Sequence, residues 1–204
     1  MFKHLIKTLA IMTMMSTWCS AQAIMLSVNP SDQLISNGSH VDVNILVSGL
    51  GNQSPNSLGA YDLDLGFDDS LLGFNSITYG DSVLGNQLDF AGFGTFTSTV
   101  VSTGTINFSE FSFDSVIDLN TLQADSFVLA TVNFSAQSLG SSVLALSVNS
   151  FGDALGDPLF TEISDGMISI VSNNVPEPAT AFLMAAGLMG FGLRKQKLTK
   201  YLQR

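Results

Sequence analysis

Strand-forming runs at regular intervals constrain the fold of this 204-residue chain more than any other feature of its sequence. Short runs of β-branched and aromatic residues alternate with clusters of Gly, Asn, Asp and Ser about every ten residues. In residues 61–67, Tyr-Asp-Leu-Asp-Leu-Gly-Phe, the apolar side chains share one face of an extended chain and the acidic ones share the other. The pattern predicts no helix between the chain ends, and strands at residues 24–28, 41–47, 60–67, 71–77, 95–101, 105–111, 127–134, 143–148 and 166–171.

A strand with one apolar face needs a second layer to cover that face, so these strands predict an antiparallel β-sandwich. They lie within residues 24–172, a length that can bury about two thirds of the unfolded chain's surface in one domain. The stretch contains no cysteine and therefore no disulfide. We expect one all-β domain of about nine strands, stabilised by apolar packing and backbone hydrogen bonds.

Charge divides the chain into three parts. All seven Lys and Arg residues lie outside residues 24–178, whereas all 17 Asp and Glu residues lie inside that range. An acidic field of this kind repels nucleic acid and anionic lipid, and it favours cations or basic partners. Each basic cluster flanks an apolar run, which is typical of segments that are directed to a membrane.

The N-terminal segment has the three parts of a secretory signal peptide. Lys3 and Lys7 precede an apolar stretch at residues 9–15, and Ala-Gln-Ala at residues 21–23 has the form of a signal-peptidase site. We predict that signal peptidase removes residues 1–23, and with them the only Trp and the only Cys of the chain. The alternative is a membrane anchor, but the apolar stretch is too short to span a hydrocarbon core of about 30 Å.

The C-terminal segment, residues 173–204, also has an ordered form. Its first part is the tripeptide Pro176, Glu177 and Pro178. An apolar stretch follows at residues 179–193, which we expect to be a single transmembrane helix, and then a basic cluster of Arg194, Lys195 and Lys197. This order resembles the PEP-CTERM sorting signal. The resemblance implies recognition by an exosortase-type membrane enzyme, transient anchoring in the inner membrane, cleavage near the tripeptide, and delivery to the cell surface or to the exopolysaccharide matrix of a biofilm. An ordinary tail anchor is the alternative.

The domain between these segments resembles a cohesin, a jelly-roll sandwich related to some carbohydrate-binding modules. The stretches that carry the resemblance are residues 60–74, 126–134 and 152–157, and they include the Phe-Asp-Asp turn at residues 67–69. The resemblance implies this architecture for residues 24–172. It also implies binding of a polysaccharide or of a dockerin-like protein partner.

Catalytic residue types are scarce in this domain. Its one histidine, His40, is expected in an exposed turn, and the lack of Cys and Lys excludes Cys-His and Schiff-base catalysis. Asp62 and Asp64 share a strand face about 6.6–7 Å apart. However, the domain has no Arg, Lys or Trp to surround them as a glycosidase requires. We predict that the protein is not an enzyme and has no catalytic residue.

Calcium is the one cofactor for which the sequence offers ligands, because calcium takes 6–8 oxygen atoms from carboxylates and carbonyls. Three places provide carboxylates: the pair Asp62 and Asp64, the turn at Asp68 and Asp69, and the loop with Asp153 and Asp157. None has the spacing of an EF-hand. A solvated strand face and turn capping are the alternatives.

Together these features predict an exported, non-enzymatic protein of the surface or extracellular matrix. The alternative is a binding module, for which an exposed aromatic row would favour sugar, and an exposed apolar sheet face or open edge would favour a protein partner. Phe90, Phe93 and Phe96 bear on this choice. We expect them to close one end of the sandwich, although exposed rings would form a patch.

Overall fold

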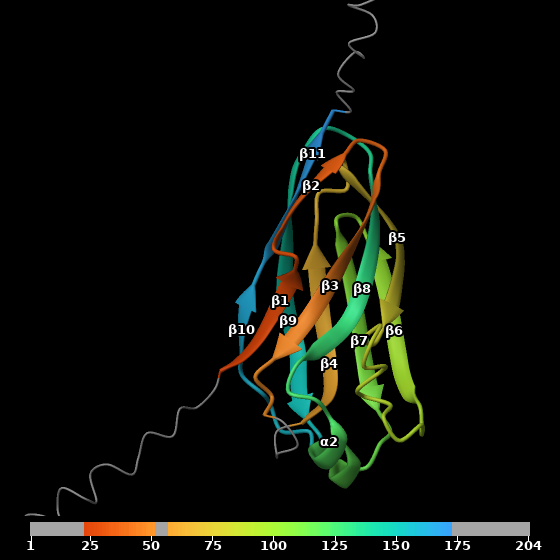
Figure 1. Cartoon of the computed structure of the whole chain (residues 1–204), viewed down its shortest axis with the longest axis vertical. Coiled ribbons are helices and arrows are strands. Elements are labelled where there is room, and N and C mark those ends of the chain that lie inside the picture. Colours follow the sequence, from red (N-terminus) through yellow and green to blue (C-terminus); the bar gives the residue numbers. More distant parts are fainter. Residues whose placement is uncertain (1–22, 52–56, 173–204) are drawn as a thin grey trace, which may run out of the picture. The chain divides into compact units, whose positions relative to one another are not determined.

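The computed structural model describes residues 23–51 and 57–172, which form eleven strands and one helix (Figure 1). The predicted sorting segment and all but the last residue of the predicted signal peptide lie outside the described residues. The elements are β1 (Ile24–Asn29), β2 (Asp32–Ser36), β3 (His40–Ser48), β4 (Leu58–Gly66), β5 (Leu72–Tyr79), β6 (Thr95–Ser102), β7 (Thr105–Ser112), α2 (Val116–Leu122), β8 (Phe127–Ala136), β9 (Gly140–Asp153), β10 (Thr161–Ser164) and β11 (Gly166–Val171).

The strands form two facing sheets. One has the order β10-β1-β3-β8-β5, and the other has the order β2-β11-β9-β4-β7-β6. β1 runs parallel to β10 and β2 runs parallel to β11, whereas the other pairings are antiparallel. Consecutive strands at each end of the domain, β1 and β2 as well as β10 and β11, lie in different sheets. The prediction of an all-β sandwich is therefore confirmed, with two parallel pairings at its edges.

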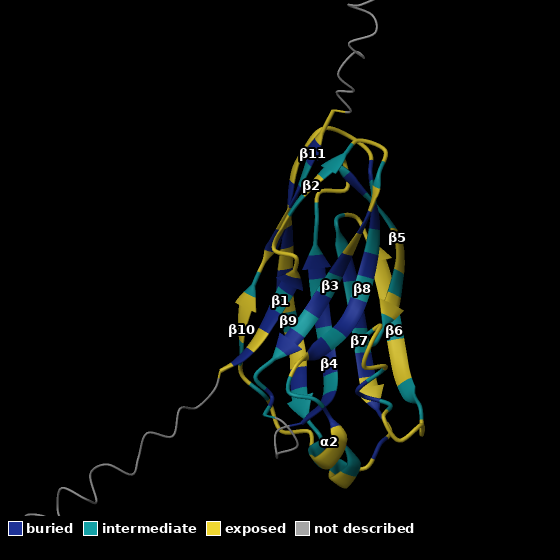
Figure 2. Ribbon diagram, in the orientation of Figure 1, coloured by how far each residue is buried: buried dark blue, intermediate teal, exposed yellow. Residues whose placement is uncertain are grey.

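The core lies between the sheets, where the predicted alternation places it (Figure 2). Val43, Ile45 and Val47 of β3 are fully buried, and so are Leu63 and Leu65 of β4. Aromatic rings pack among them, with Tyr61 edge-on to Phe108 and Phe67 tilted against Phe134. Each fully buried side chain of this size contributes roughly 1.5–3 kcal/mol relative to an exposed one. Apolar packing of this extent replaces the missing disulfides.

Three elements depart from the predicted set. β2 and β10 were not predicted because they are short, with five and four residues, and neither has a clear apolar face. The prediction of no helix was wrong, since α2 forms between β7 and β8. Ser115 caps it: the Ser115 hydroxyl accepts from the Asp118 backbone N–H and donates to the Asp118 carboxylate. Only Leu119 of this helix is buried, so the sequence has no apolar stripe that would predict the helix.

No helix in residues 23–51 and 57–172 combines the length and the apolar character that crossing a membrane requires. The transmembrane helix predicted at residues 179–193 lies outside the described residues.

Candidate functional site

The outward side of β9, β4, β7 and β6 forms one continuous surface, which we call the outer face. Phe96 of β6 pairs with Phe111 of β7, and Asn107 of β7 pairs with Asp64 of β4. Asp64 in turn pairs with Ser147 of β9. Since residues that pair directly across strands point to the same side of a sheet, these five side chains lie on one face.

Two carboxylates lie at the centre of the outer face. The side-chain amide nitrogen of Asn107 donates to Asp62 over 2.6 Å and to Asp64 over 2.8 Å. Asn149 of β9 donates to Asp62 from the other side over 3.3 Å. The structure therefore brings the predicted pair together, with one amide between the two acids. No Lys or Arg occurs anywhere in residues 24–178, so this negative charge is not balanced within the domain.

Exposed aromatic rings lie beside the acidic pair at the β6–β7 end of the outer face. Phe96 is 63% exposed, Phe111 52% and Phe113 55%. The rings of Phe111 and Phe113 meet edge to face with centroids 5.7 Å apart. Phe90 and Phe93 are also exposed, in the loop that precedes β6. We call these five residues the aromatic cluster. The expectation that Phe90, Phe93 and Phe96 close one end of the sandwich was wrong, because their rings face solvent.

Buried polar groups hold the loop that presents Phe90 and Phe93. The Asp114 carboxylate accepts from the Ala91 backbone N–H over 2.9 Å, and Asp89 accepts from the Gly94 N–H over 2.6 Å. The Ser112 hydroxyl donates to the Leu88 carbonyl. In the described residues, Asp114 Oδ1 is buried without a hydrogen-bond partner. The loop is thus attached to the end of β7 by side chains of β7 and of the residues that follow it.

Glu110 links this loop to the core. Its side chain points inward from β7 and is 2% exposed. One carboxylate oxygen accepts from the Asn86 amide over 2.6 Å, and the other accepts from the Tyr61 hydroxyl over 3.0 Å. Burial raises the pKa of Tyr61 well above its ordinary value, and the nearby Glu110 charge raises it further. Glu110 therefore joins β4, β7 and the loop after β5 in one hydrogen-bonded unit.

The other candidate calcium ligands have local roles. Asp68 accepts from the hydroxyl and the backbone N–H of Ser70, and these hydrogen bonds lower the pKa of Asp68. Asp69 is exposed in the same turn. Asp153 accepts from the backbone N–H groups of Leu155 and Asp157. Within the part of the chain that the structure describes, no three His, Cys, Asp or Glu residues gather as a metal site would require. Calcium binding stays a prediction.

His40 is exposed, as the sequence predicts, but it is the first residue of β3 and not part of a turn. Its Nδ1 atom lies 3.2 Å from the amide nitrogen of Asn75. The sequence argument missed Asn107, Phe111 and Phe113 as members of the outer face. The signal that could have found them is the parity set by buried Ile106 and Phe108, because it places odd-numbered residues of β7 outward, and Phe113 directly follows the last residue of that strand.

Two sequence families match this chain. Residues 26–170 match the model of the cohesin domain, and residues 174–197 match the PEP-CTERM protein-sorting motif. The second match confirms the motif that the tripeptide and the basic cluster predicted. No curated protein sequence is similar to the chain at a significant level.

Solved cohesin structures have the same fold. A non-cellulosomal cohesin from the hyperthermophilic archaeon Archaeoglobus fulgidus is 18% identical with a TM-score of 0.55, over 74% of this chain and 94% of that one. A chain of the type I cohesin–dockerin complex Coh-OlpA-Doc918 from Clostridium thermocellum is 13% identical with a TM-score of 0.58, over 73% and 99%. CaCohA2 from Clostridium acetobutylicum is 17% identical with a TM-score of 0.56, over 76% and 95%. At these identities the likeness concerns the fold alone.

Proposed function

Because this chain belongs to the cohesin domain family, we propose that its domain is a non-catalytic docking module for a dockerin-like protein partner. The observation that carries the proposal is the outer face itself, where the aromatic cluster lies beside Asp62 and Asp64 on a rigid sheet. Related cohesins have been crystallised in complex with dockerins. Large exposed aromatic side chains on a soluble domain are typical of a surface that a protein partner covers.

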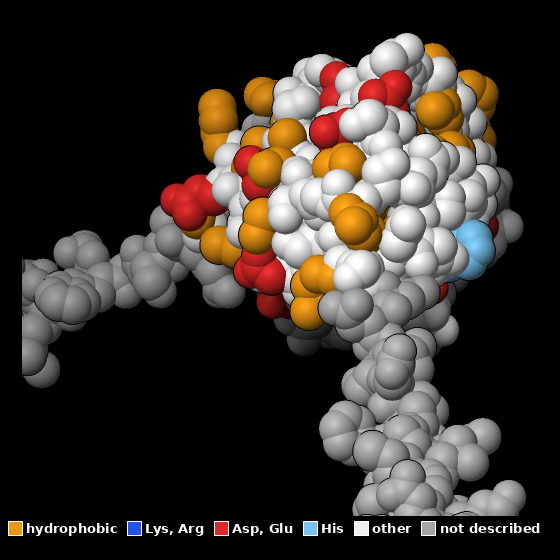
Figure 3. Space-filling model, turned by 90° about the horizontal axis from the view of Figure 1, so that it is seen from above, with side chains coloured by type: hydrophobic (Ala, Val, Ile, Leu, Met, Phe, Trp, Pro, Cys, Tyr) orange, Lys and Arg blue, Asp and Glu red, His pale blue; other side chains and the backbone are white. Residues whose placement is uncertain are grey.

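The charge of the domain defines the partner further. The described residues contain no Lys or Arg, and Figure 3, which looks at the end of the domain near β2 and β11, shows acidic side chains interspersed with hydrophobic ones. A partner that covers the outer face must remove Asp62 and Asp64 from water. Burying two carboxylates is costly unless they receive hydrogen bonds or an opposite charge. The partner therefore presents apolar side chains to the rings and Lys, Arg or hydroxyl donors to the acids.

The family match at residues 174–197 supports the second part of the proposal, which concerns sorting. A signal peptide at residues 1–23 starts export, and residues 179–193 hold the chain in the membrane until an exosortase-type enzyme cuts near Pro176, Glu177 and Pro178. The domain at residues 24–172 then reaches the cell surface or an extracellular matrix that contains exopolysaccharide. Docking at that place recruits the partner to the surface without any chemical step by this chain.

Isothermal titration calorimetry of the purified full chain against dockerin modules encoded in the same genome tests the docking proposal. The test variant is the double substitution Phe96→Ser and Phe111→Ser, and the matched control is Phe160→Ser. Phe160 is 89% exposed but lies in the segment before β10. This segment pairs with the end of β9 and is separated from β7 and β6 by β9 and β4. All three rings are exposed, so none of the substitutions leaves a cavity in the core.

We expect one module to bind, and we expect the double variant to lose about 100-fold in affinity, since two aromatic anchors contribute roughly 1–2 kcal/mol each. The Phe160→Ser control retains the wild-type affinity. Failure of every dockerin module to bind contradicts the proposal. Equal loss in the control and the double variant contradicts the assignment of the outer face.

A further inference from the structure

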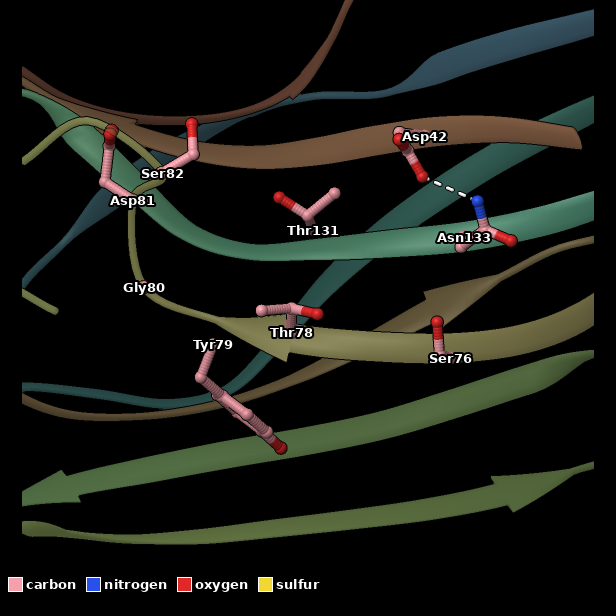
Figure 4. A pocket seen from close by; sticks show the side chains of 9 residues that line it. All are labelled: Asp42, Ser76, Thr78, Tyr79, Gly80, Asp81, Ser82, Thr131 and Asn133. Carbon is pink, nitrogen blue, oxygen red and sulfur yellow. Dashed lines mark hydrogen bonds between the residues drawn. The ribbon is translucent and has the colours of Figure 1, made fainter. Parts of the chain in front are cut away.

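A polar hollow lies on the sheet opposite the outer face. It has a volume of about 360 Å³ and lies over β3, β8 and β5, next to the turn that follows β5 (Figure 4). Most of its lining residues are polar, with four hydroxyl groups from Ser76, Thr78, Ser82 and Thr131, the amide of Asn133, and the two carboxylates of Asp42 and Asp81. Tyr79 turns its ring away from the hollow toward β6, where its hydroxyl lies 2.7 Å from the Ser98 carbonyl and from the Thr99 hydroxyl.

Side-chain hydrogen bonds hold the Asn133 amide and the Asp42 carboxylate of this hollow in place. Asn133 donates to Asp42 over 2.6 Å and accepts from Asn75 over 2.8 Å. The Thr131 hydroxyl donates to the Asn44 side chain over 2.8 Å. At the turn, the Asp81 carboxylate accepts from three backbone N–H groups, which fixes that end of the hollow. The floor is therefore organised before any ligand arrives, which lowers the entropic cost of binding.

Three hydroxyl groups of the hollow are available to a ligand. Within the described residues, the hydroxyls of Ser76, Thr78 and Ser82 have no hydrogen-bond partner. Ser76 and Thr78 point to the same side of β5, about 6.6–7 Å apart along the strand. The pairing register places Ser76 beside Asn133 and Thr78 beside Thr131, so polar groups of two strands lie side by side. A ligand here meets hydroxyl groups that can each donate and accept a hydrogen bond.

The lining excludes other ligand classes. An anionic ligand finds no Lys or Arg in the domain, and an apolar ligand finds no Leu, Ile, Val, Met or Phe side chain among the residues that line the hollow. A metal ion would find only two carboxylates there, and Asp81 already accepts three backbone hydrogen bonds. An added peptide strand would pair along the free edge of β5, whereas the hollow lies on the face of the sheet.

We propose that this hollow binds a neutral, hydroxyl-rich saccharide unit of a polysaccharide. This inference rests on the part of the proposed function that places the domain in an extracellular matrix with exopolysaccharide. It does not depend on the docking of a protein partner. The hollow and the outer face lie on opposite sides of the core, so both can be occupied at once. The domain would then connect a polysaccharide to the partner that the outer face recruits.

Affinity electrophoresis of the full chain in native gels tests this inference, with hydroxyethyl cellulose or dextran as neutral probes and alginate as the anionic probe. The test variant is Thr78→Lys, which fills the hollow from an exposed strand position. The matched control is Thr97→Lys, which makes the same change at an exposed position of β6 outside the hollow. Far-UV circular dichroism and urea midpoints verify that both variants are folded.

We expect at least one neutral polysaccharide to retard the chain and alginate to have no effect. Thr78→Lys weakens the retardation at least about fivefold, since it removes one or more hydrogen bonds worth about 0.5–1.5 kcal/mol each. Thr97→Lys does not weaken it, and neither does the double variant Phe96→Ser and Phe111→Ser, which separates this inference from the docking proposal. No retardation by either neutral probe, equal retardation by alginate, or an unchanged Thr78→Lys variant would overturn the inference.

Discussion

Replacement of Glu110 tests how the core supports the aromatic cluster. Glu110 accepts from Asn86 over 2.6 Å and from the Tyr61 hydroxyl over 3.0 Å, and it is 2% exposed. Glu110→Ala removes both acceptors and leaves a small cavity. The Tyr61 hydroxyl then has only the Leu129 carbonyl, at 3.4 Å. Unsatisfied buried donors cost about 1–3 kcal/mol each, so we expect Glu110→Ala to destabilise the fold by about 2–4 kcal/mol.

Glu110→Gln is the matched control. Its carbonyl can accept from Asn86, its amide can donate to the Tyr61 oxygen, and Tyr61 can donate to the Leu129 carbonyl. All partners are then satisfied, and no buried charge remains. We expect this variant to lie within about 1 kcal/mol of the wild type, because replacing a buried charge by a satisfied neutral group is often nearly neutral.

Urea unfolding followed by far-UV circular dichroism measures both effects. A shift of the midpoint at an unchanged m-value reports a change in stability alone. If Glu110→Gln is as destabilising as Glu110→Ala, the negative charge itself is required and the hydrogen-bond argument is wrong. If Glu110→Ala costs less than about 1 kcal/mol, Glu110 does not link the loop to the core in the way that its contacts indicate.

Three further predictions concern the same fold. Burial raises the pKa of Tyr61 above its ordinary value of 10.0, so the folded state retains the Tyr61 proton more strongly than the unfolded chain does. The stability that this proton contributes is fully present below pH 10 and falls as the pH rises further. Tyr61→Phe therefore reduces the pH dependence of the urea midpoint measured from pH 8 to 11. Desolvation raises the pKa of Asp81, but hydrogen bonds from the backbone N–H groups of Val128, Leu84 and Val83 together outweigh it and lower the pKa. The stability that the Asp81 carboxylate contributes is therefore present above the pKa of the unfolded chain and is lost as the pH falls through the pKa of the folded state. Asp81→Asn should lower the stability at pH 7 by about 1–2 kcal/mol and make the loss of stability on acidification smaller. A Cβ at Gly59 would lie 2.5 Å from the Asp153 carbonyl oxygen, whereas one at Gly66 of the same strand meets nothing closer than 3.6 Å. We expect Gly59→Ala to destabilise the fold by about 1–3 kcal/mol and to lower the thermal midpoint by several degrees. An equal effect of Gly66→Ala would refute the steric argument.

The alternation of apolar and polar residues predicted most of the sandwich, because burial of one strand face dominates in β3 and β4. It also placed Asp62 and Asp64 on the same side. The polarity of β7 is inverted at one point, where Glu110 points inward and Phe111 outward. The parity of Ile106 and Phe108 predicts this arrangement, but the residue types argue against it. The partners that stabilise Glu110 lie 24 and 49 residues away in the sequence, where no local pattern can reveal them.

The hollow on the five-stranded sheet could not have been predicted from the sequence. Asp42, Asn133 and Ser76 come from three strands, and only the pairing register brings them side by side. The register of β5 against β8 shifts between Phe74 and Ser76, so a regular pairing extended from one end of β5 would place the wrong side chains together. The sequence did not predict the short polar strands β2 and β10 for a related reason. Pairing with longer neighbouring strands stabilises them, and their own composition does not.

The central claim is that a protein partner covers the outer face of the six-stranded sheet. Hydrogen–deuterium exchange of the full chain, alone and with a bound dockerin module, measures this most directly. We predict slower exchange in the loop at residues 80–94, in β6 and in β7, with no change in β5 and β8. Protection confined to β3, β5 and β8, or no protection in β6 and β7 when the module is bound, would contradict the account.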